Sequence, residues 1–275
     1  MKNQYRILNF LYDTKIGRII LKPMVSSKRF SNFVAYFIDR KISKLFIKPF
    51  IKKNGINMDD FKDEKYDSFN DFFTRKIKKN RRPISKDNNT FLAPCDSKLT
   101  CYKIDDKLLF KVKNSTYSVE SLINNKTIAK EFNGGYALVF RLSPDDYHRY
   151  MYIDDGVIND NYKIDGIFNT VNPIVYDKHM VFKENQRECT YVNTKNFGKI
   201  MYIEVGALLV GKIVNAKNSG SFKRSEEKGY FMYGGSTVIL LIEKNKVKIN
   251  NNILTMSKEG KEMIVKYGET IGYKI

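Results

Sequence analysis

One segment of the sequence could make a reactive group out of the chain itself. Residues 226–242 read EEKGYFMYGGSTVILLI, which places Gly235 and Ser236 at the start of an apolar run. A serine hydroxyl beside an unhindered glycine carbonyl can attack that carbonyl and form an ester, if a base takes its proton and donors bind the oxyanion. Elimination and hydrolysis then leave a pyruvoyl ketone at position 236 and release ammonia. A Gly-Gly hairpin turn before a strand is the simpler alternative, and this segment alone leaves it open.

Two other segments offer a base and an acid. His148 lies in LSPDDYHRYMYIDDG, beside Arg149 and several carboxylates, where a general base is one interpretation and a histidine packed among tyrosines is the other. His179, the second of only two histidines, is expected in a partly exposed loop or strand. Asp96, in APCDSK, indicates a turn, and an aspartate there could also orient a histidine in a nucleophile–base–orienter set.

Taken together, these segments resemble the phosphatidylserine decarboxylase family of pyruvoyl enzymes, in its clostridial-type single-domain form. The resemblance rests on collinear motifs between about residues 66 and 242, which are FFTRKIKKNRRPI, APCDSKL, VKNSTYSVESLI, LSPDDYHRY, VNPIVYDKHMVFKENQRE, VGALLVGKIV and EEKGYFMYGGSTVILL. Each motif is weak when taken alone, whereas chance agreement of the whole ordered set is very improbable.

The resemblance implies a precursor that cleaves itself between Gly235 and Ser236. It implies a β chain of residues 1–235, an α chain of residues 236–275, and a covalent pyruvoyl cofactor (bound pyruvate) made from Ser236. Asp96 and His148 would assist this cleavage as orienter and base. Phosphatidylserine would then form a Schiff base with the ketone and lose carbon dioxide, and phosphatidylethanolamine would be released.

Two positions depart from the family pattern. Many members have a second histidine three residues after the first, where this chain has Met151, and a methionine cannot accept a proton. His148 would then have to serve in both self-cleavage and turnover. Asp96 is followed by Ser97 instead of the usual glycine, which changes the turn but keeps the acid.

The N-terminal region is strongly basic. The chain has 49 Lys and Arg and 30 Asp and Glu, for a net charge of +19, and residues 1–56 carry 13 basic and 2 acidic residues. Apolar residues there recur at helical spacing, with Ser26 or Ser27 as a cap and a helix end predicted near Pro49. We therefore expect residues 1–65 to form a membrane-associating region of basic amphipathic helices, although docking of these helices on the core is an alternative.

From about residue 91 the pattern changes to short strands between turns, so residues 66–275 are expected to form a β-rich catalytic domain. The predicted strands are Lys98–Ile104, Leu108–Val112, Tyr136–Leu142, Gly156–Ile164, Lys199–Val205, Val210–Val214, Ser236–Ile242 and Val247–Ile249. Alternation in KIMYIEV indicates a half-buried strand, and STVILLI indicates a buried one. The fold class is α+β, a helical N-terminal region followed by a mostly antiparallel β body.

Composition excludes several classes of protein. Three cysteines without a CxxC pair argue against a disulfide framework and a cysteine-rich zinc site, and two histidines argue against a histidine-rich metal site. No signal peptide and no span of about 18 apolar residues is visible. We expect a peripheral protein on the cytoplasmic side of the cell membrane, with phosphatidylserine in an anionic membrane as partner. A homo-oligomer stays open.

Three alternative functions remain at this stage. One is a decarboxylase that acts on another lipid or on a soluble phosphoserine-like head group. Another is a non-processed, non-catalytic homologue that binds anionic lipid, for which Met151 is the best support. The basic and aromatic segment DSFNDFFTRKIKKNRRP, with a short helix predicted to begin at Asp67 or Ser68, permits a nucleic-acid-binding protein, but no recognition motif supports it and no nucleic-acid partner is expected.

Overall fold

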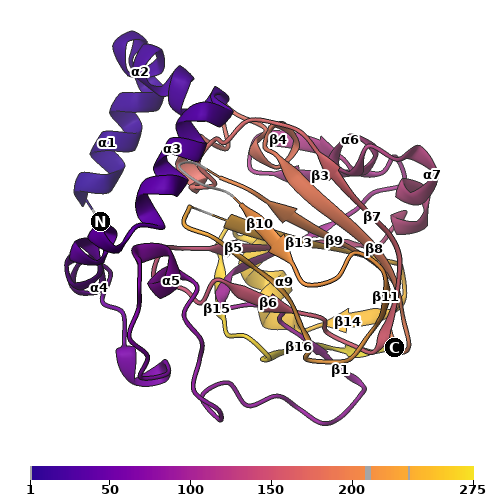
Figure 1. Cartoon of the computed structure of the whole chain (residues 1–275). Coiled ribbons are helices and arrows are strands. Elements are labelled where there is room, and N and C mark those ends of the chain that lie inside the picture. Colours follow the sequence, from indigo (N-terminus) through magenta and orange to yellow (C-terminus); the bar gives the residue numbers. More distant parts are fainter. Residues whose placement is uncertain (1, 208–211, 235) are drawn as a thin grey trace.

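The computed structural model describes residues 2–207, 212–234 and 236–275. A large antiparallel sheet forms the centre of the protein, and helices from the N-terminal region lie at one end of it (Figure 1). Every strand pairing among the named strands is antiparallel. The predicted α+β class, with a helical N-terminal region and a mostly antiparallel β body, is confirmed.

The central sheet has eight strands, and β13 lies in its middle between β9 and β5. In spatial order the strands are β11 (Gly220–Phe222), β7 (Gly156–Ile164), β8 (Arg187–Thr194), β9 (Gly198–Val205), β13 (Ser236–Ile242), β5 (Tyr136–Leu142), β2 (Ser97–Lys103) and β15 (Met263–Val265). The predictions for β5, β7, β13 and β14 agree with the structure at both ends, and those for β2, β3 and β9 agree to within one residue. The prediction Val210–Val214 falls partly on residues outside the described part. Within the described residues, β10 begins at Ile213.

Three smaller strand groups complete the β structure. They are a sheet of β10 (Ile213–Asn215), β12 (Glu227–Phe231) and β6 (Arg149–Met151), a sheet of β1 (Thr90–Leu92), β16 (Thr270–Lys274) and β14 (Val247–Ile249), and a hairpin of β3 (Leu109–Val112) and β4 (Ser115–Ser118). β1 and β6, which the sequence pattern did not predict, are only three residues long, too short for a repeating pattern to show.

Both faces of the central sheet are covered by hydrophobic cores. In β13, Val238 and Leu240 belong to one core, whereas Ile239 and Leu241 belong to the other, as the alternation of side chains along a strand requires. The prediction that STVILLI is buried is confirmed. The prediction of a half-buried strand for KIMYIEV is wrong, because β9 is covered on both faces and its residues from Ile200 onward are all buried.

Helices and short 3-10 turns surround this body. They are α1 (Lys2–Asp13), α2 (Lys15–Ser26), α3 (Lys28–Ile38), η1 (Lys41–Phe46), α4 (Ile47–Asn54), η2 (Met58–Asp60), α5 (Phe69–Phe73), α6 (Val119–Ile123), α7 (Lys126–Ala129), η3 (Lys130–Phe132), η4 (Pro173–Val175), α8 (Val181–Glu184) and α9 (Asn251–Lys258).

The ends of the N-terminal helices follow from their capping residues. The Ser27 hydroxyl accepts a hydrogen bond from the Phe30 N–H, and the Ser68 hydroxyl accepts one from the Asp71 N–H, so both predicted caps are confirmed. The helix end predicted near Pro49 is wrong. Pro49 is the third residue of α4, within the first turn, where no intrahelical N–H bond is lost.

The N-terminal helices are anchored to the body by α1 and α2. Tyr12 is buried, and its hydroxyl accepts a hydrogen bond of 3.0 Å from the Thr170 N–H. The Val25 carbonyl accepts one of 2.9 Å from the Phe168 N–H. An aromatic cluster further along packs residues on both sides of position 65, among them Phe61 and Phe72. The division of the chain into residues 1–65 and 66–275 stays a prediction.

Candidate active site

Ser236 stands at the first position of β13, opposite Leu142 at the end of β5. Its side chain is fully buried, and its Oγ lies 3.0 Å from Nδ1 of His148. The structure therefore brings together the nucleophile and the base that the sequence predicted. Gly235, the predicted partner at the cleavage site, lies outside the described residues.

A backbone carbonyl fixes the proton position on the His148 ring. The Nε2 atom lies 3.0 Å from the carbonyl oxygen of Ser143. A carbonyl only accepts hydrogen bonds, so Nε2 carries the ring proton and Nδ1 presents its lone pair to the Ser236 hydroxyl. The serine proton thus points at a basic nitrogen, which is the arrangement that nucleophilic activation requires.

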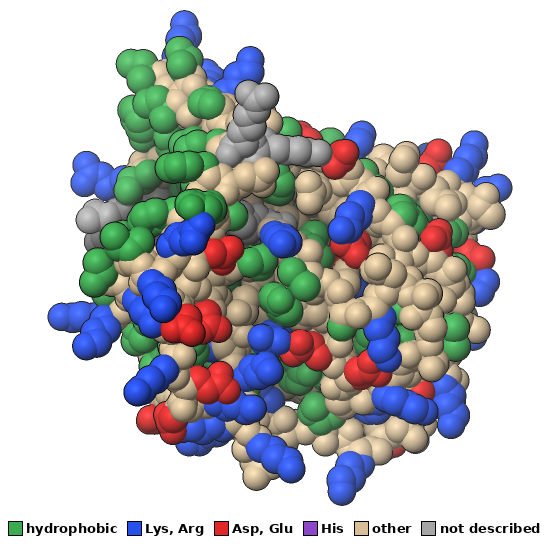
Figure 2. All heavy atoms as spheres, in the orientation of Figure 1, with side chains coloured by type: hydrophobic (Ala, Val, Ile, Leu, Met, Phe, Trp, Pro, Cys, Tyr) green, Lys and Arg blue, Asp and Glu red, His purple; other side chains and the backbone are tan. Residues whose placement is uncertain are grey.

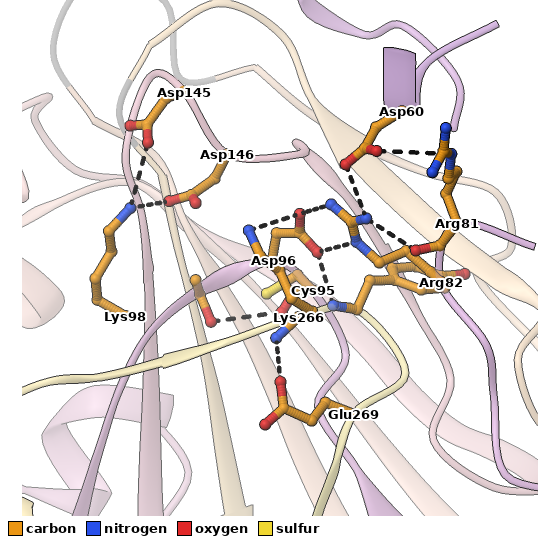
Figure 3. Close-up of polar contacts among 12 residues, drawn as sticks. Asp60, Arg81, Arg82, Cys95, Asp96, Lys98, Asp145, Asp146, Lys266 and Glu269 are labelled. Carbon is orange, nitrogen blue, oxygen red and sulfur yellow. Dashed lines mark hydrogen bonds and ion pairs between the residues drawn. The ribbon is translucent and has the colours of Figure 1, made fainter. Parts of the chain in front are cut away.

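The carbonyl of Ser143 belongs to a turn that two charged side chains hold in place. Asp146 accepts a hydrogen bond of 2.7 Å from the Ser143 N–H, and its own N–H donates to the Ser143 carbonyl over 2.9 Å. Lys98 approaches Asp146 to 2.6 Å and the more exposed Asp145 to 3.9 Å, as Figure 3 shows. The turn that orients His148 is therefore fastened to β2 by an ion pair.

His148 is a neutral base in this environment. It is fully buried, and the Phe73 ring lies on it with ring centroids 4.1 Å apart. The pKa of His148 is lowered to about 3, chiefly by burial and secondly by the positive charge of Arg75, while the Ser143 carbonyl opposes the shift. The imidazole is consequently unprotonated at neutral pH, the state in which it can accept the serine proton.

Asp96 lies in a different set of contacts from the one predicted. Its carboxylate forms a two-pronged ion pair with Arg82, at 2.9 Å and 2.6 Å, and accepts a hydrogen bond from the Tyr267 N–H (Figure 3). Lys266 lies 3.6 Å away. Within the described residues, the two ring nitrogens of His148 have Ser236 and Ser143 as partners, and not Asp96. The role of Asp96 as orienter stays a prediction.

Met151 is buried in one of the two cores, and its N–H donates to the carbonyl of Pro94. A methionine cannot accept a proton, and among the described residues His148 is the side chain in hydrogen-bond contact with the Ser236 hydroxyl. His179 lies apart from the site. It is 3.3 Å from Glu184 and packs edge-on against Tyr12, in a partly exposed segment as the sequence predicted.

A buried ion pair lies close to Ser236 on the same side of the sheet. Glu204 stands opposite Val238, two residues along β13 from Ser236, and its Oε1 lies 3.0 Å from Nζ of Lys228. Both side chains are fully buried. Burial raises the pKa of Glu204, and the ammonium of Lys228 opposes that shift.

Three groups of the site were not predicted from the sequence. Ser143 acts through a backbone carbonyl, which no residue type reveals. Lys98 and Arg82 lie in motifs noted for other reasons, and their ion pairs with Asp146 and Asp96 depend on the tertiary fold. The three cysteines are free and buried. The described residues contain no group of three or more His, Cys, Asp or Glu side chains that could hold a metal ion.

The site therefore has the features of a self-processing serine: a buried hydroxyl at a strand end, and a neutral imidazole fixed in the correct tautomer. A comparison with protein-family models matches residues 69–273 to phosphatidylserine decarboxylase. The chain belongs to the phosphatidylserine decarboxylase family.

Curated relatives agree with this assignment. The chain is 46% identical over 265 residues to phosphatidylserine decarboxylase proenzyme 2 of Clostridium acetobutylicum. The matched region covers 96% of this chain and 91% of the relative. It is 41% identical over 274 residues to the phosphatidylserine decarboxylase proenzyme of Clostridium botulinum strain Hall, covering 98% and 93%. The proenzyme of Clostridium tetani is 40% identical over 275 residues, covering 98% and 92%. The resemblance found in the motifs is confirmed over nearly the whole chain.

Proposed function

We propose that this chain is a phosphatidylserine decarboxylase, made as a precursor that cleaves itself between Gly235 and Ser236. The observation that carries the proposal is the 3.0 Å approach of the buried Ser236 hydroxyl to the unprotonated nitrogen of His148. Membership of the family and the proenzyme names of its relatives support it.

In self-cleavage, His148 takes the proton of Ser236 as the hydroxyl oxygen attacks the carbonyl carbon of Gly235. His148 then gives a proton to the departing nitrogen of Ser236, and an ester links the two residues. Loss of the α-proton of residue 236 expels the carboxylate of Gly235 and leaves dehydroalanine, and hydrolysis of its enamine releases ammonia. Ser236 thereby becomes a pyruvoyl group at the start of the α chain.

The buried surroundings of Ser236 fit this product. A pyruvoyl ketone supplies an electron sink for the electrons left behind when carbon dioxide departs. Phe73 and the buried strands around Ser236 exclude water, and His148 is the titratable side chain in hydrogen-bond contact with that position. We therefore assign to His148 the transfer of one proton: it takes the proton that the ammonium group of the bound substrate gives up, and returns it to the α-carbon after carbon dioxide has left.

The α and β chains would stay together after cleavage. Residues 236–275 contain β13, which pairs over its length with β9 and β5 of residues 1–235. Its side chains from Ser236 to Ile242 are all buried. Cleavage therefore yields a non-covalent complex, with the new chain start at the edge of the central sheet's core.

The N-terminal region offers a surface for a bilayer. Eleven of the fifteen exposed large hydrophobic side chains of the described residues lie between residues 7 and 46, including Ile19 and Leu45, each 73% exposed. Figure 2 shows hydrophobic side chains gathered over the N-terminal helices, with Lys and Arg around them. Soluble monomers rarely expose so much contiguous apolar surface. In the described part of the chain, none of the helices has the length and hydropathy needed to cross a membrane.

We propose that this face rests on the cytoplasmic side of the cell membrane as a peripheral contact. Basic side chains would draw it to anionic lipid with about 1 kcal/mol per Lys or Arg near the surface. The exposed isoleucine, leucine and phenylalanine side chains would enter the head-group boundary.

The test is the intact mass of the purified full-length protein. We expect two chains that break between residues 235 and 236, with the α chain lighter by the serine-to-pyruvoyl difference and blocked to N-terminal sequencing. Ser236→Ala should stay whole. A single full-length mass in folded wild-type protein that binds anionic vesicles would refute the proposal and favour a non-catalytic lipid-binding homologue.

A further inference from the structure

Arg75 carries a positive charge into the aromatic cluster next to the active site. Its side chain is 1% exposed, and its guanidinium lies between two rings, 4.1 Å from the centroid of Phe61 and 4.8 Å from that of Phe72. Cation–π contact offsets part of the cost of burying the charge. Rings satisfy the faces of a guanidinium, however, and leave the N–H groups at its edge in need of acceptors.

The N–H groups of Arg75 are poorly satisfied. Nη1 reaches the Phe72 carbonyl at 3.4 Å, and Nε and Nη2 have no hydrogen-bond partner among the described residues. Arg187, a buried arginine with a structural role, differs from Arg75 in that its N–H donors have acceptors. Its guanidinium donates to four backbone carbonyls, at distances from 2.6 to 3.1 Å. A buried cation whose N–H donors lack acceptors lowers the stability of the fold, unless an anion binds to those donors.

The acidic residues near Arg75 do not form an ion pair with it. Asp96 is paired with Arg82, and Asp145 lies beside Lys98. Both act on Arg75 at longer range by raising its pKa, while burial, the larger effect, lowers that pKa to about 10. Arg75 is thus cationic at neutral pH and has no ion-pair partner in the described part of the chain.

Arg75 is close enough to the active site to act on a molecule bound there. Its charge is the second-largest cause of the low pKa of His148. Phe73, two residues earlier, packs on the His148 ring, and the Thr74 carbonyl accepts a 2.8 Å hydrogen bond from Arg149. The segment that carries Arg75 is therefore fastened to β6, directly after His148.

We propose that Arg75 binds the phosphodiester of the substrate head group through Nε and Nη2. This inference rests on the proposed function. Two neighbouring N–H groups of a guanidinium match two oxygens of a phosphate. Access requires the Phe61 ring to turn aside, and Phe61 lies in a stretch between η2 and α5 whose regular structure is limited to a single bridge with Ile77.

The phosphodiester suits this site better than the carboxylate of the same head group. Loss of carbon dioxide removes negative charge from the carboxylate, so a cation bound to that group would stabilise the ground state more than the transition state. Binding the phosphate instead holds the substrate in place and leaves its carboxylate in apolar surroundings such as Phe73.

The experiment compares wild type with Arg75→Met, Arg75→Lys and the control Arg81→Met, an exposed neighbour that lies 3.7 Å from Asp60. Self-cleavage is followed by intact mass, and decarboxylation is followed on phosphatidylserine in mixed micelles. Glycerophosphoethanolamine, a phosphodiester without a carboxylate, serves as competitor, with ethanolamine as the phosphate-free comparison.

We expect all variants to cleave themselves. For Arg75→Met, KM and the inhibition constant of glycerophosphoethanolamine should rise about 10- to 100-fold, the range for losing hydrogen bonds to a charged group. Arg75→Lys should recover part of that loss, and Arg81→Met should match wild type. In wild type, glycerophosphoethanolamine should compete far better than ethanolamine.

Three results would overturn the inference. Unchanged competition by glycerophosphoethanolamine in a folded Arg75 variant would show that the phosphate binds elsewhere. Loss of self-cleavage in both folded variants would move Arg75 to the precursor reaction. Equal competition by glycerophosphoethanolamine and ethanolamine in wild type needs no variant, and would remove the phosphate site even if Arg75→Met fails to fold. Failure of the wild type to cleave or decarboxylate would instead count against the proposed function.

Discussion

Self-cleavage should be almost independent of pH between 8 and 5. A histidine with its ordinary pKa of about 6.5 would be mostly protonated at pH 5, and a reaction that needs its neutral form would slow about 30-fold. In this structure burial lowers the pKa of His148 to about 3, so the ring stays neutral at pH 5. The rate of the first step should then fall less than about twofold.

The assay uses precursor made by cell-free synthesis and shifted to each pH at the start of the reaction. Elimination breaks the chain by itself, and hydroxylamine in a denaturing quench cleaves any ester that has not yet eliminated. Total chain breakage on a gel therefore reports formation of the ester, the first step. Ser236→Ala, which forms no ester, gives the background. Circular dichroism at each pH identifies the range in which the precursor stays folded.

The result that would refute the reasoning is an acid limb with a midpoint near pH 6.5 in folded precursor. It would mean that water reaches His148 and that burial does not set its pKa.

The burial of His148 also predicts how the stability of the folded precursor changes with pH. The folded pKa lies below the unfolded one, so the unfolded state binds more protons, and stability contributed by His148 is complete above about pH 6.5 and falls as the pH drops toward 3.

Three further predictions follow from the contacts around the site. Lys98→Met should slow self-cleavage about 10-fold or more by freeing the turn that orients His148, while Asp145→Asn should change the rate less than about twofold; equal effects in a timed mass assay would contradict this role. Leu45→Asp should weaken sedimentation with anionic vesicles at least about fivefold without altering self-cleavage, and unchanged sedimentation would remove this face from the membrane contact. Lys228→Met should cost about 3–5 kcal/mol in urea unfolding of the precursor, because it leaves Glu204 buried without its partner, whereas Lys228→Met with Glu204→Leu should recover most of that loss; a double variant no more stable than the single one would be the contrary result.

Much of the fold could be predicted from the sequence because its strands are bounded by clear turns. β5, β7, β13 and β14 lie where the pattern placed them. The prediction for β9 was wrong about burial, since alternation of side-chain types does not reveal that a second core covers the other face. Pro49 was misjudged because a proline stops a helix only beyond its first turn.

The candidate site was predictable only in part. Ser236 and His148 stood out by their types and motifs, yet they are 88 residues apart, and only the sheet brings them to 3.0 Å. The Ser143 carbonyl and the free edge of Arg75 leave no trace in residue type. Asp96 was predicted to orient His148, and its pairing with Arg82, 14 residues earlier in the chain, depends on how the segment between them folds.

The pairing of β5 with β13 makes self-cleavage depend on correct folding. Ser236 meets His148 only when β13 is in register with β5, because the turn that carries His148 continues directly from the end of β5. A slip by one residue would point Ser236 to the opposite face of the sheet. The cofactor would then never form. Under the proposed mechanism, a misfolded copy would remain an uncleaved and inactive single chain, whereas a correctly folded copy would activate itself by cleavage.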